Sequence, residues 1–494
     1  MNAPAHKPED FVVKTHDVEA VNRKEDRALY ADKPSIYPKL AHGTFRRLKW
    51  ILMAVTLGIY YLIPWLRWDR GTDLPNQAVL LDMSKQRFFL FNLEIWPQEF
   101  YFVTGLLILA ALVLFLVTSL AGRVWCGYFC PQTVWTDLMV SVERFWQGDR
   151  NARIKLDKSP WTFDKIYKKT VTHLTWLLIG LLTGGAFVFY FVDAPTLLRE
   201  LFTGTAAVEV YAAIAILTLT TYGLGGIARE QVCIYMCPWP RIQGAMVDHD
   251  TYFVSYRDYR GEPRGSHRKN QSWDERGDCV NCKACIAVCP MGIDIRDGSQ
   301  LECIQCALCI DACNDIMTKV GRPRNLIAYD TIANQEAAAK HTTAQPKFLR
   351  ARTLVYIGLI GLVGGIMLWA LSQRSMLEAD VLADRNPYFV RLSNGDIRNG
   401  FTLKILNKLH EPHRFTISVD GLKNATLKIG ETTGDNPIIT VPTDIMSEVR
   451  AFVTVPKATA MSLSMHGYPF KFVVHDVDTS STTRHPSTFR RPLK

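Results

Sequence analysis

The sequence has no isolated cysteine and therefore no sign of a disulfide framework. Its 12 cysteines lie in short clusters at positions 126 and 130, 233 and 237, 279, 282, 285 and 289, and 303, 306, 309 and 313. A secreted disulfide scaffold spreads its cysteines over distant loops, so this clustering excludes that class of protein. Cysteines two or three residues apart indicate metal ligands in a reducing compartment.

The sequence also lacks a phosphate-binding glycine loop, a nucleophile elbow and any nucleic-acid-binding motif. Its net charge of +10 is therefore better explained by an anionic membrane surface than by nucleic acid. The 494 residues are too many for one ordinary domain. The hydrophobic residues, 48% of the chain, gather into runs without charge, which favours a membrane protein.

Five apolar runs are long enough to cross a hydrocarbon layer about 30 Å thick. They occupy residues 50–66, 100–121, 174–192, 210–228 and 353–372. A long polar segment precedes the first run and no small-residue cleavage site follows it, which argues against a signal peptide. Glycines in the third, fourth and fifth runs suit close helix packing in lipid.

The placement of Lys and Arg orients these runs. The loop 123–170 is rich in both residues, and others lie just before the first and fifth runs, whereas the loop 193–209 carries only Arg199. Because cytoplasmic loops carry an excess of Lys and Arg, the amino terminus, the loop 123–170 and residues 229–352 are predicted to be cytoplasmic. Residues beyond 373 are then exported, and every cysteine lies on the cytoplasmic side.

This pattern divides the chain into five predicted parts. They are a polar cytoplasmic tail (1–45), a four-span membrane domain (46–228), a cytoplasmic segment (229–350), a fifth span (351–372) and an exported domain (373–494). The exported part has short alternating apolar runs separated by turn residues, as at Asn399-Gly400, which predicts an antiparallel β-sandwich. The predicted fold class is a polytopic α-helical membrane protein with an inserted double-cubane ferredoxin domain and a C-terminal Ig-like antiparallel β-sandwich.

The most specific motif occurs twice in the cytoplasmic segment. Residues 279–290 read CVNCKACIAVCP and residues 303–313 read CIQCALCIDAC, so each has the spacing C-x2-C-x2-C-x3-C. Bacterial ferredoxins use this spacing for 4Fe–4S clusters, with the fourth cysteine of each run binding the other cluster. The expected ligands are Cys279, Cys282, Cys285 and Cys313 for one cluster, and Cys289, Cys303, Cys306 and Cys309 for the other. Zinc knuckles are the weaker alternative because they normally use two C-x2-C pairs.

Two shorter motifs follow the second and fourth apolar runs. CGYFCP (126–131) and CIYMCP (233–238) are both C-x3-C-P with a central Tyr, and they form a weak internal repeat. On a helix, residues four apart share a face, so both sulfurs of a pair could point the same way. Four thiolates meeting just inside the membrane would suit Cu(I), zinc or iron–sulfur, and Cys126, Cys130, Cys233 and Cys237 are therefore candidate ligands of one metal site. The alternative is that these cysteines only pack between helices.

Together these features resemble the CcoG/FixG/RdxA family. The similarity extends over nearly the whole chain and includes RGEPRG (260–265), WPQEF (96–100) and DRNPYFVRLSNGDIRNGFTLKILNK (384–408). Part of it is shared with the NapH-type membrane polyferredoxins, which lack the exported sandwich. The resemblance implies an accessory protein for assembly of the cbb-type cytochrome c oxidase in the bacterial inner membrane. It also implies reduction of Cu(II) to Cu(I), with oxidase subunits and copper chaperones as partners. With that activity, the expected copper-handling site consists of Cys126, Cys130, Cys233 and Cys237.

Two further functions stay open at this stage. One is an electron-transfer subunit that carries electrons from quinol to a partner and handles no copper. The other is a non-catalytic assembly scaffold whose clusters only stabilise the fold. The sequence does not identify the electron donor, the route of copper or the oligomeric state.

Overall fold

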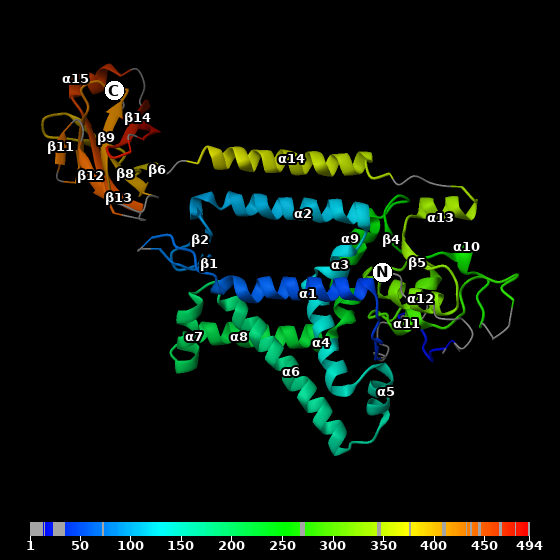
Figure 1. The fold of residues 1–494 in the computed structure, drawn as a ribbon. Helices are drawn as coiled ribbons and strands as arrows, with labels where there is room; N and C mark the ends of the chain where they lie inside the picture. The colour runs from blue at the N-terminus through cyan, green and yellow to red at the C-terminus, as the bar shows by residue number, and fades with distance from the viewer. Residues whose placement is uncertain are drawn as a thin grey trace. The chain divides into compact units, whose positions relative to one another are not determined.

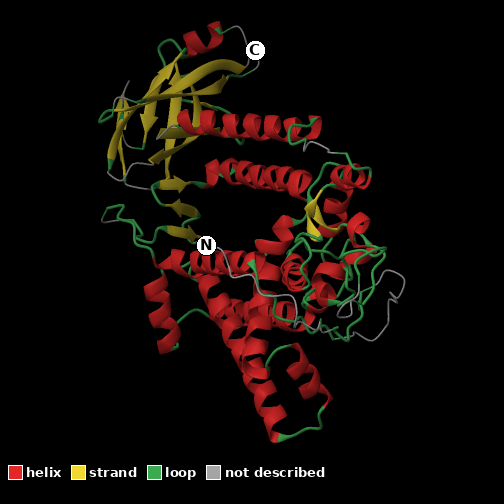
Figure 2. Cartoon of the chain, turned by 45° about the vertical axis from the view of Figure 1, so that its right-hand side comes forward, coloured by secondary structure: helices red, strands yellow, loops and turns green. Residues whose placement is uncertain are grey.

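The computed structural model describes residues 13, 15–22, 35–71, 74–266, 272–342, 347–374, 377–407, 412–430, 432–434, 437–442, 446–463, 467–479 and 481–492. The chain forms two compact units, Met1–Met367 and Leu368–Lys494. The first is mainly helical and the second consists mainly of β-strands (Figure 1 and Figure 2). Each unit is described by itself.

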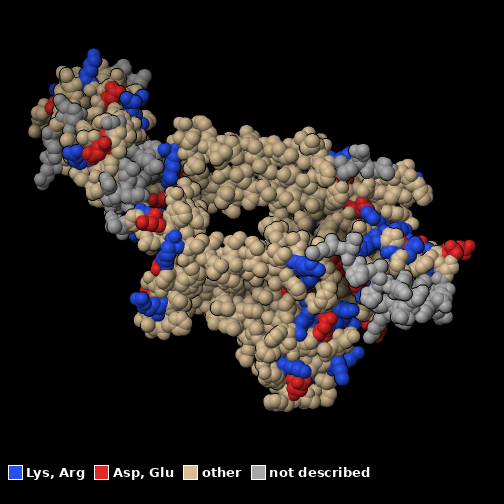
Figure 3. Space-filling model, in the orientation of Figure 1, with Lys and Arg blue, Asp and Glu red and all other residues tan. Residues whose placement is uncertain are grey.

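Five helices among the described residues are long and apolar enough to cross a membrane, and they overlap the five predicted runs. Their bounds are Thr44–Trp65, Pro97–Ala121, Phe163–Val188, Val208–Ala228 and Ala351–Ser372. The α-helical parts are α1 (Thr44–Leu62), α2 (Tyr101–Ala121), α6 (Phe163–Val188), α8 (Val208–Thr221) and α14 (Ala351–Ser372), and the π-helical segment η4 (Tyr222–Ala228) continues α8. Over α1 and α2, Figure 3 shows a band without Lys, Arg, Asp or Glu, flanked by charged residues.

Glycines explain how closely α6 approaches α8. A Cβ atom added at Gly180 would lie 2.8 Å from the carbonyl oxygen of Thr218, and one at Gly184 would lie 2.9 Å from that of Ile214. Small residues at such points let two backbones approach, as the third apolar run predicted. The glycines of α14 differ, because a Cβ there would meet no described atom within 4 Å. Helix α14 does approach α2, where a Cβ at Gly105 would lie 2.6 Å from Sδ of Met367, but the glycines of the fifth run do not face this contact.

Shorter elements connect these helices. Between α1 and α2 lies an antiparallel sheet of β1 (Val79–Asp82), β2 (Arg87–Leu90) and β3 (Leu93–Ile95). After α2 come α3 (Val124–Tyr128), α4 (Pro131–Gln147) and α5 (Arg150–Lys158), and α7 (Ala194–Thr203) separates α6 from α8. The π-helical segment η5 (Val232–Met236) and α9 (Trp239–Met246) lead into the ferredoxin segment.

The ferredoxin segment consists largely of loops between short helices (Figure 2). Its elements are β4 (Phe253–Tyr256), α10 (Asp258–Gly261), α11 (Ala284–Ala287), α12 (Leu308–Lys319), β5 (Ile327–Asp330) and α13 (Ile332–Ala339). Strands β4 and β5 pair antiparallel and bring its two ends together.

A carboxylate attaches this segment to the first membrane helix. Asp311 on α12 accepts hydrogen bonds from the backbone amides of Arg46 (2.8 Å) and Phe45 (3.3 Å) in the first turn of α1. A carboxylate at this position satisfies amides that have no partner within the helix and complements the helix dipole. The Arg46 side chain in turn forms a buried ion pair with Asp137 of α4 at 2.8 Å. Helices α12, α1 and α4 are thus linked by polar contacts.

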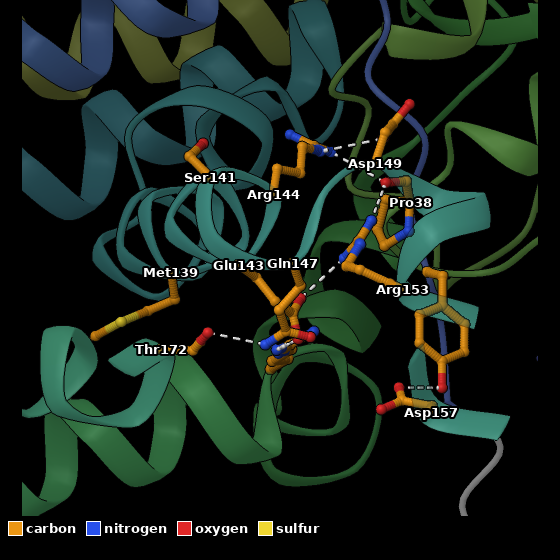
Figure 4. Close-up of polar contacts among 12 residues, drawn as sticks. Pro38, Met139, Ser141, Glu143, Arg144, Gln147, Asp149, Arg153, Asp157 and Thr172 are labelled. Atoms are coloured by element: carbon orange, nitrogen blue, oxygen red, sulfur yellow. Dashed lines mark hydrogen bonds and ion pairs between the residues drawn. The ribbon is translucent and has the colours of Figure 1, made fainter. Parts of the chain in front are cut away.

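A second polar network supports α4 (Figure 4). Glu143 of α4 pairs with Arg153 of α5 at 2.8 Å and with Arg229, which follows η4, at 2.9 Å. Burial alone would raise the pKa of Glu143, but Arg229 and Arg153 lower it below the usual range. Arg153 also donates to the carbonyl oxygen of Pro38 at 2.6 Å. Glu143 therefore remains charged and holds the segments around the cysteine pairs in place.

The second unit is an antiparallel β-sandwich. One sheet has the order β11-β10-β13-β8-β6, with β7 also paired to β8, and the other has the order β12-β9-β14-β15. The bounds are β6 (Leu377–Ala383), β7 (Val390–Arg391), β8 (Ile397–Asn407), β9 (His413–Asp420), β10 (Thr426–Ile429), β11 (Thr432–Gly434), β12 (Ile438–Val441), β13 (Met446–Val455), β14 (Gly467–Asp476) and β15 (Thr482–Arg490), with a short helix α15 (Lys457–Ser462). Alternate residues of β8, such as Phe401 and Leu403, are buried against Phe415 and Phe472 of the other sheet. This alternation is the pattern on which the predicted sandwich rested.

Candidate metal centres

The two ferredoxin runs fold into loops with the same unusual backbone. Positive φ angles occur at Asn281 (51°) and Lys283 (55°) in the first run, and at Gln305 (56°) and Ala307 (59°) in the second. These residues flank the second cysteine of each run. A left-handed residue in such a turn directs successive backbone N–H groups to one side, which favours an anionic ligand. Helices α11 and α12 begin immediately after the loops.

The structure gathers the eight ferredoxin cysteines into two groups. Cys279, Cys282, Cys285 and Cys313, here called the far group, line one cavity together with apolar side chains. Cys289, Cys303, Cys306 and Cys309, here called the near group, line a second cavity, which Cys285 also borders. Each run therefore supplies three cysteines to one group, and its fourth cysteine lies with the other run. These are the two sets expected from the sequence.

Burial raises the pKa of thiols in both groups. Burial, together with neighbouring Cys282 and Cys279, raises the pKa of Cys313 to about 12. The pKa of Cys289 is likewise raised to about 12 by burial and by Cys306. Four soft sulfur ligands around a dry cavity fit a 4Fe–4S cluster, whose binding would release these protons.

Cys126, Cys130, Cys233 and Cys237, here called the thiolate site, also come together. Burial raises the pKa of Cys233 to about 12, with further contributions from Cys130, Cys126 and Cys237. The two C-x3-C-P pairs are neighbours, because Cys233 packs against the buried cluster that contains Cys126. Exposure differs within the site, because Cys126 is buried and Cys237 is exposed.

The expectation that each pair lies on one helix face is only half met. Cys126 lies in α3 and Cys233 in η5, but Cys130 and Cys237 have extended backbones with ψ angles of 126° and 122°. The proline after each of these two cysteines explains the difference, because a proline disfavours helical backbone at the preceding residue. Pro131 then begins α4, and Pro238 precedes α9. The second cysteine of each pair thus lies in the turn between two helices.

The first cysteine pair packs directly on the second ferredoxin run. A Cβ atom at Gly127 would lie 2.8 Å from the carbonyl oxygen of Ile304 and 3.1 Å from Cα of Cys306. The Tyr128 hydroxyl donates to the carbonyl oxygen of Cys306 at 3.2 Å. Cys126 and Cys306 belong to the same buried cluster. Glycine at position 127 is therefore what allows the two backbones to touch.

Arg123 stabilises the contact between the first cysteine pair and the second ferredoxin run. Its backbone amide donates to Oε1 of Gln305 at 2.9 Å, and its guanidinium donates to the carbonyl oxygen of Cys303 at 3.0 Å. Arg123 also lowers the pKa of Cys126, which burial raises. The guanidinium therefore lies beside both the thiolate site and the near group, where it opposes their negative charge.

Two buried donors support the presence of an anionic ligand at the thiolate site. Nε of Arg123 and Nε1 of Trp239 are buried and have no hydrogen-bond partner among the described residues. Trp239 packs against the cluster that contains Cys126 and Cys306. A buried donor without a partner costs about 1–3 kcal/mol. A thiolate at Cys126, beside Arg123, would accept from the guanidinium, and four such thiolates are a donor set that can hold a metal.

The sequence analysis gave no role at the site to Gln243, Gln305 or Arg123. Gln243 is fully buried and contacts Cys126, and Gln305 contacts Arg123. Gln243 lies six residues after Cys237, at the position of Thr136 in the first repeat. The sequence signal for this residue was the presence of a polar side chain, Gln243, in the mostly apolar stretch after the second C-x3-C-P motif.

Comparison with known proteins agrees with this description of the chain. Residues 228–332 match the family model of a 4Fe-4S dicluster domain, residues 103–147 match that of a 4Fe-4S binding domain, and residues 367–492 match that of the Ig-like fold at the C-terminus of FixG. The chain is 50% identical to nitrogen fixation protein FixG of Rhizobium meliloti over 473 residues, 89% of this chain and 90% of that protein.

Two proteins of Cereibacter sphaeroides are equally similar. The chain is 50% identical to protein RdxA over 435 residues, 87% of this chain and 91% of that protein. It is 49% identical to protein RdxB over 466 residues, 94% of this chain and 97% of that protein. These matches extend through both units of the structure.

Proposed function

Because the chain belongs to the FixG/RdxA family of iron–sulfur proteins, we propose that it is a membrane-bound electron-transfer protein that reduces Cu(II) to Cu(I). The Cu(I) would serve assembly of a cbb-type cytochrome c oxidase. Clusters of the 4Fe–4S type, bound by the far and near groups, would supply one-electron transfer. Copper is the substrate, and each Cu(II) takes up one electron.

The observation that carries this proposal is the contact between Gly127 and the backbone of the near group. It brings Cys126 into the same buried cluster as Cys306, so no further carrier is needed between the two sites. Thiolates are soft ligands and bind Cu(I) better than Cu(II), so they favour the reduced product. The exposed Cys237 leaves one side of the site open for copper to enter and leave.

The test combines metal analysis with a reduction assay. Full-length protein purified without oxygen should contain about eight irons per chain, as two four-iron clusters require. After chemical reduction and removal of excess reductant, it should convert Cu(II) to Cu(I). The double variant Cys126→Ala/Cys233→Ala should keep its iron and lose both bound Cu(I) and copper reduction. Normal copper content and an unchanged reduction rate in that variant would rule out the thiolate site.

A second candidate function is electron transfer from quinol without copper. It is favoured by the match of residues 103–147 to a 4Fe-4S binding domain, because this range contains Cys126 and Cys130. If the thiolate site held a third four-iron cluster, the iron content would rise to about 12 per chain. The double variant would then lose about four irons. The iron content of the two proteins therefore separates the candidates.

The proposed location is the bacterial inner membrane, with all cysteines cytoplasmic and the β-sandwich periplasmic. The five apolar helices and the distribution of Lys and Arg support this topology. A reporter fused after Lys494 should be active only in the periplasm, and one fused near Pro160 only in the cytoplasm. Both fusions reporting the same side would contradict the five-span topology. An exported sandwich could bind an oxidase subunit or a copper chaperone. A simple quinol relay has no evident use for such a domain.

A further inference from the structure

Gln243 is an unusual side chain to find fully buried beside the thiolate site. It lies on α9 with 0% exposure, and its carboxamide contacts both Cys126 and Thr118 of α2. Buried amides are almost always hydrogen-bonded, because an unpaired polar group in the interior costs free energy. The contacts that satisfy this amide therefore show what it does.

Cys126, Gln243 and Thr118 form a chain of hydrogen bonds in which each side chain donates to the next group. Sγ of Cys126 donates to Oε1 of Gln243 at 3.2 Å, and Nε2 of Gln243 donates to Oγ1 of Thr118 at 3.2 Å. The Thr118 hydroxyl donates to the carbonyl oxygen of Leu114 at 2.8 Å. Thr118 is fully buried and Cys126 is 8% exposed, so solvent cannot easily replace these contacts. The first of these hydrogen bonds requires a proton on Cys126.

This order cannot persist when Cys126 holds a metal. A ligating cysteine is a thiolate, which accepts hydrogen bonds and cannot donate them. Oε1 would then face a negatively charged sulfur, and two buried acceptors would oppose each other. Rotation of the carboxamide by half a turn removes the conflict. Nε2 then donates to Sγ, and Oε1 accepts from the Thr118 hydroxyl.

We propose that Gln243 is a positioning residue that turns its carboxamide on metal binding and donates a hydrogen bond to the Cys126 sulfur. The inference rests on the proposed metal at the thiolate site but applies equally to copper and to iron. A hydrogen bond to a ligating sulfur withdraws electron density from it and favours the reduced metal. Gln243 thereby raises the reduction potential of the site, which helps electrons to reach it.

The test measures the midpoint potential of the metal at the thiolate site in full-length protein loaded with Cu(I) without oxygen. Gln243→Leu removes the donor, so the ratio of reduced to oxidised metal at the wild-type midpoint should fall about tenfold, or about 59 mV for one electron. Gln243→Glu keeps the shape but places a carboxylate against the sulfur, and should lower the ratio further. Thr118→Val removes only the hydroxyl that is hydrogen-bonded to the Gln243 carboxamide, and should lower the ratio of reduced to oxidised metal by a smaller factor.

The controls separate this effect from a loss of structure. Gln335→Leu alters an amide that donates to Ser255, away from the cysteine pairs, and should leave the potential unchanged. The potentials of the ferredoxin clusters in every variant report whether the protein is folded. If the metal binds but Leu and Glu variants keep the wild-type potential, the role of Gln243 is overturned while the proposed function stands. If wild-type protein binds no metal at these thiolates, both are overturned, and iron in place of copper overturns only the copper assignment.

Discussion

The ferredoxin cysteines and the thiolate site use the same side chain in different surroundings. None of the eight ferredoxin cysteines is exposed, whereas the thiolate site grades from buried Cys126 to exposed Cys237. Metal sites that serve structure or storage are closed by the protein, and sites that exchange a ligand keep one side open. If both sites hold metal, this difference predicts that the ferredoxin cysteines retain theirs and that the thiolate site exchanges it.

The largest expected effect divides the near group from the far group. Cys282→Ser and Cys306→Ser should each remove about four irons per chain, since each breaks one four-iron site. Among the described residues, the near group touches the thiolate site and the far group does not. Each reduced cluster supplies one electron, so wild-type protein should reduce about two Cu(II) per chain. Chemically reduced Cys282→Ser, which keeps the near group, should still reduce about one. Cys306→Ser should reduce almost none. Equal losses in the two variants would mean that the near group is not the exit for electrons.

A large but smaller effect concerns access to the sulfurs. In protein stripped of copper, maleimide should label exposed Cys237 about a hundredfold faster than buried Cys126, because alkylation requires contact with the thiolate. Mass spectrometry of time points would measure both rates. Cu(I) added beforehand should protect Cys237, and the ferredoxin cysteines should stay unlabelled throughout. Similar rates at Cys237 and Cys126 would contradict an open site.

Local spacing predicted which ferredoxin cysteines lie together. The far and near groups each take three cysteines from one C-x2-C-x2-C-x3-C run and the fourth from the other run. The five helices and the central strands β8, β9, β13 and β14 follow from apolar runs and alternation. Strand β15 was missed because its sequence, TTRHPSTFR, is polar and contains a proline.

What spacing could not predict is the contact between segments far apart in the chain. Gly127 touches Ile304, and Gln243 touches Cys126, although the two residues of each contact lie more than a hundred positions apart in the chain. Such contacts depend on tertiary packing, which produces no periodic pattern in the sequence. The prediction that each cysteine pair lies on one helix face failed for the second cysteine of each pair. Pro131 and Pro238 disfavour helical backbone at the cysteine that precedes them.

The contact itself can be broken by one methyl group. Gly127→Ala would place its Cβ against the carbonyl oxygens of Ile304 and Gln305, at 2.8 and 3.0 Å, so the two loops would have to separate. Overpacking of this kind costs about 1–3 kcal/mol of unfolding free energy. Electron transfer to copper should slow about tenfold, the factor that about 1.4 kcal/mol represents. Stopped-flow mixing of reduced protein with Cu(II) would measure the rate.

Gly185→Ala is the matched control for that variant. Gly185 lies in α6, and a Cβ there would meet no described atom within 4 Å. Alanine should therefore leave the rate unchanged and stabilise the helix by up to about 1 kcal/mol. If both glycine variants slow the reaction equally, the effect comes from helix stability and not from the contact with the near group.

The smallest effect compares the two tyrosines at the centre of the repeated motifs. Tyr128 is 4% exposed and donates to the carbonyl oxygen of Cys306, whereas Tyr235 is 54% exposed. Tyr128→Phe should cost about 1 kcal/mol of unfolding free energy, the typical net value of one hydrogen bond. Because the ring still packs, copper reduction should slow by only about twofold if half of that free energy is lost from the contact. Tyr235→Phe should change neither quantity, since its hydroxyl is accessible to water. Thermal unfolding followed by the visible absorption of the iron–sulfur clusters, together with the stopped-flow rate, would measure both. An equal loss in the two variants would show that the repeated tyrosines act alike and that the closed surroundings of the first motif have no role in joining it to the near group.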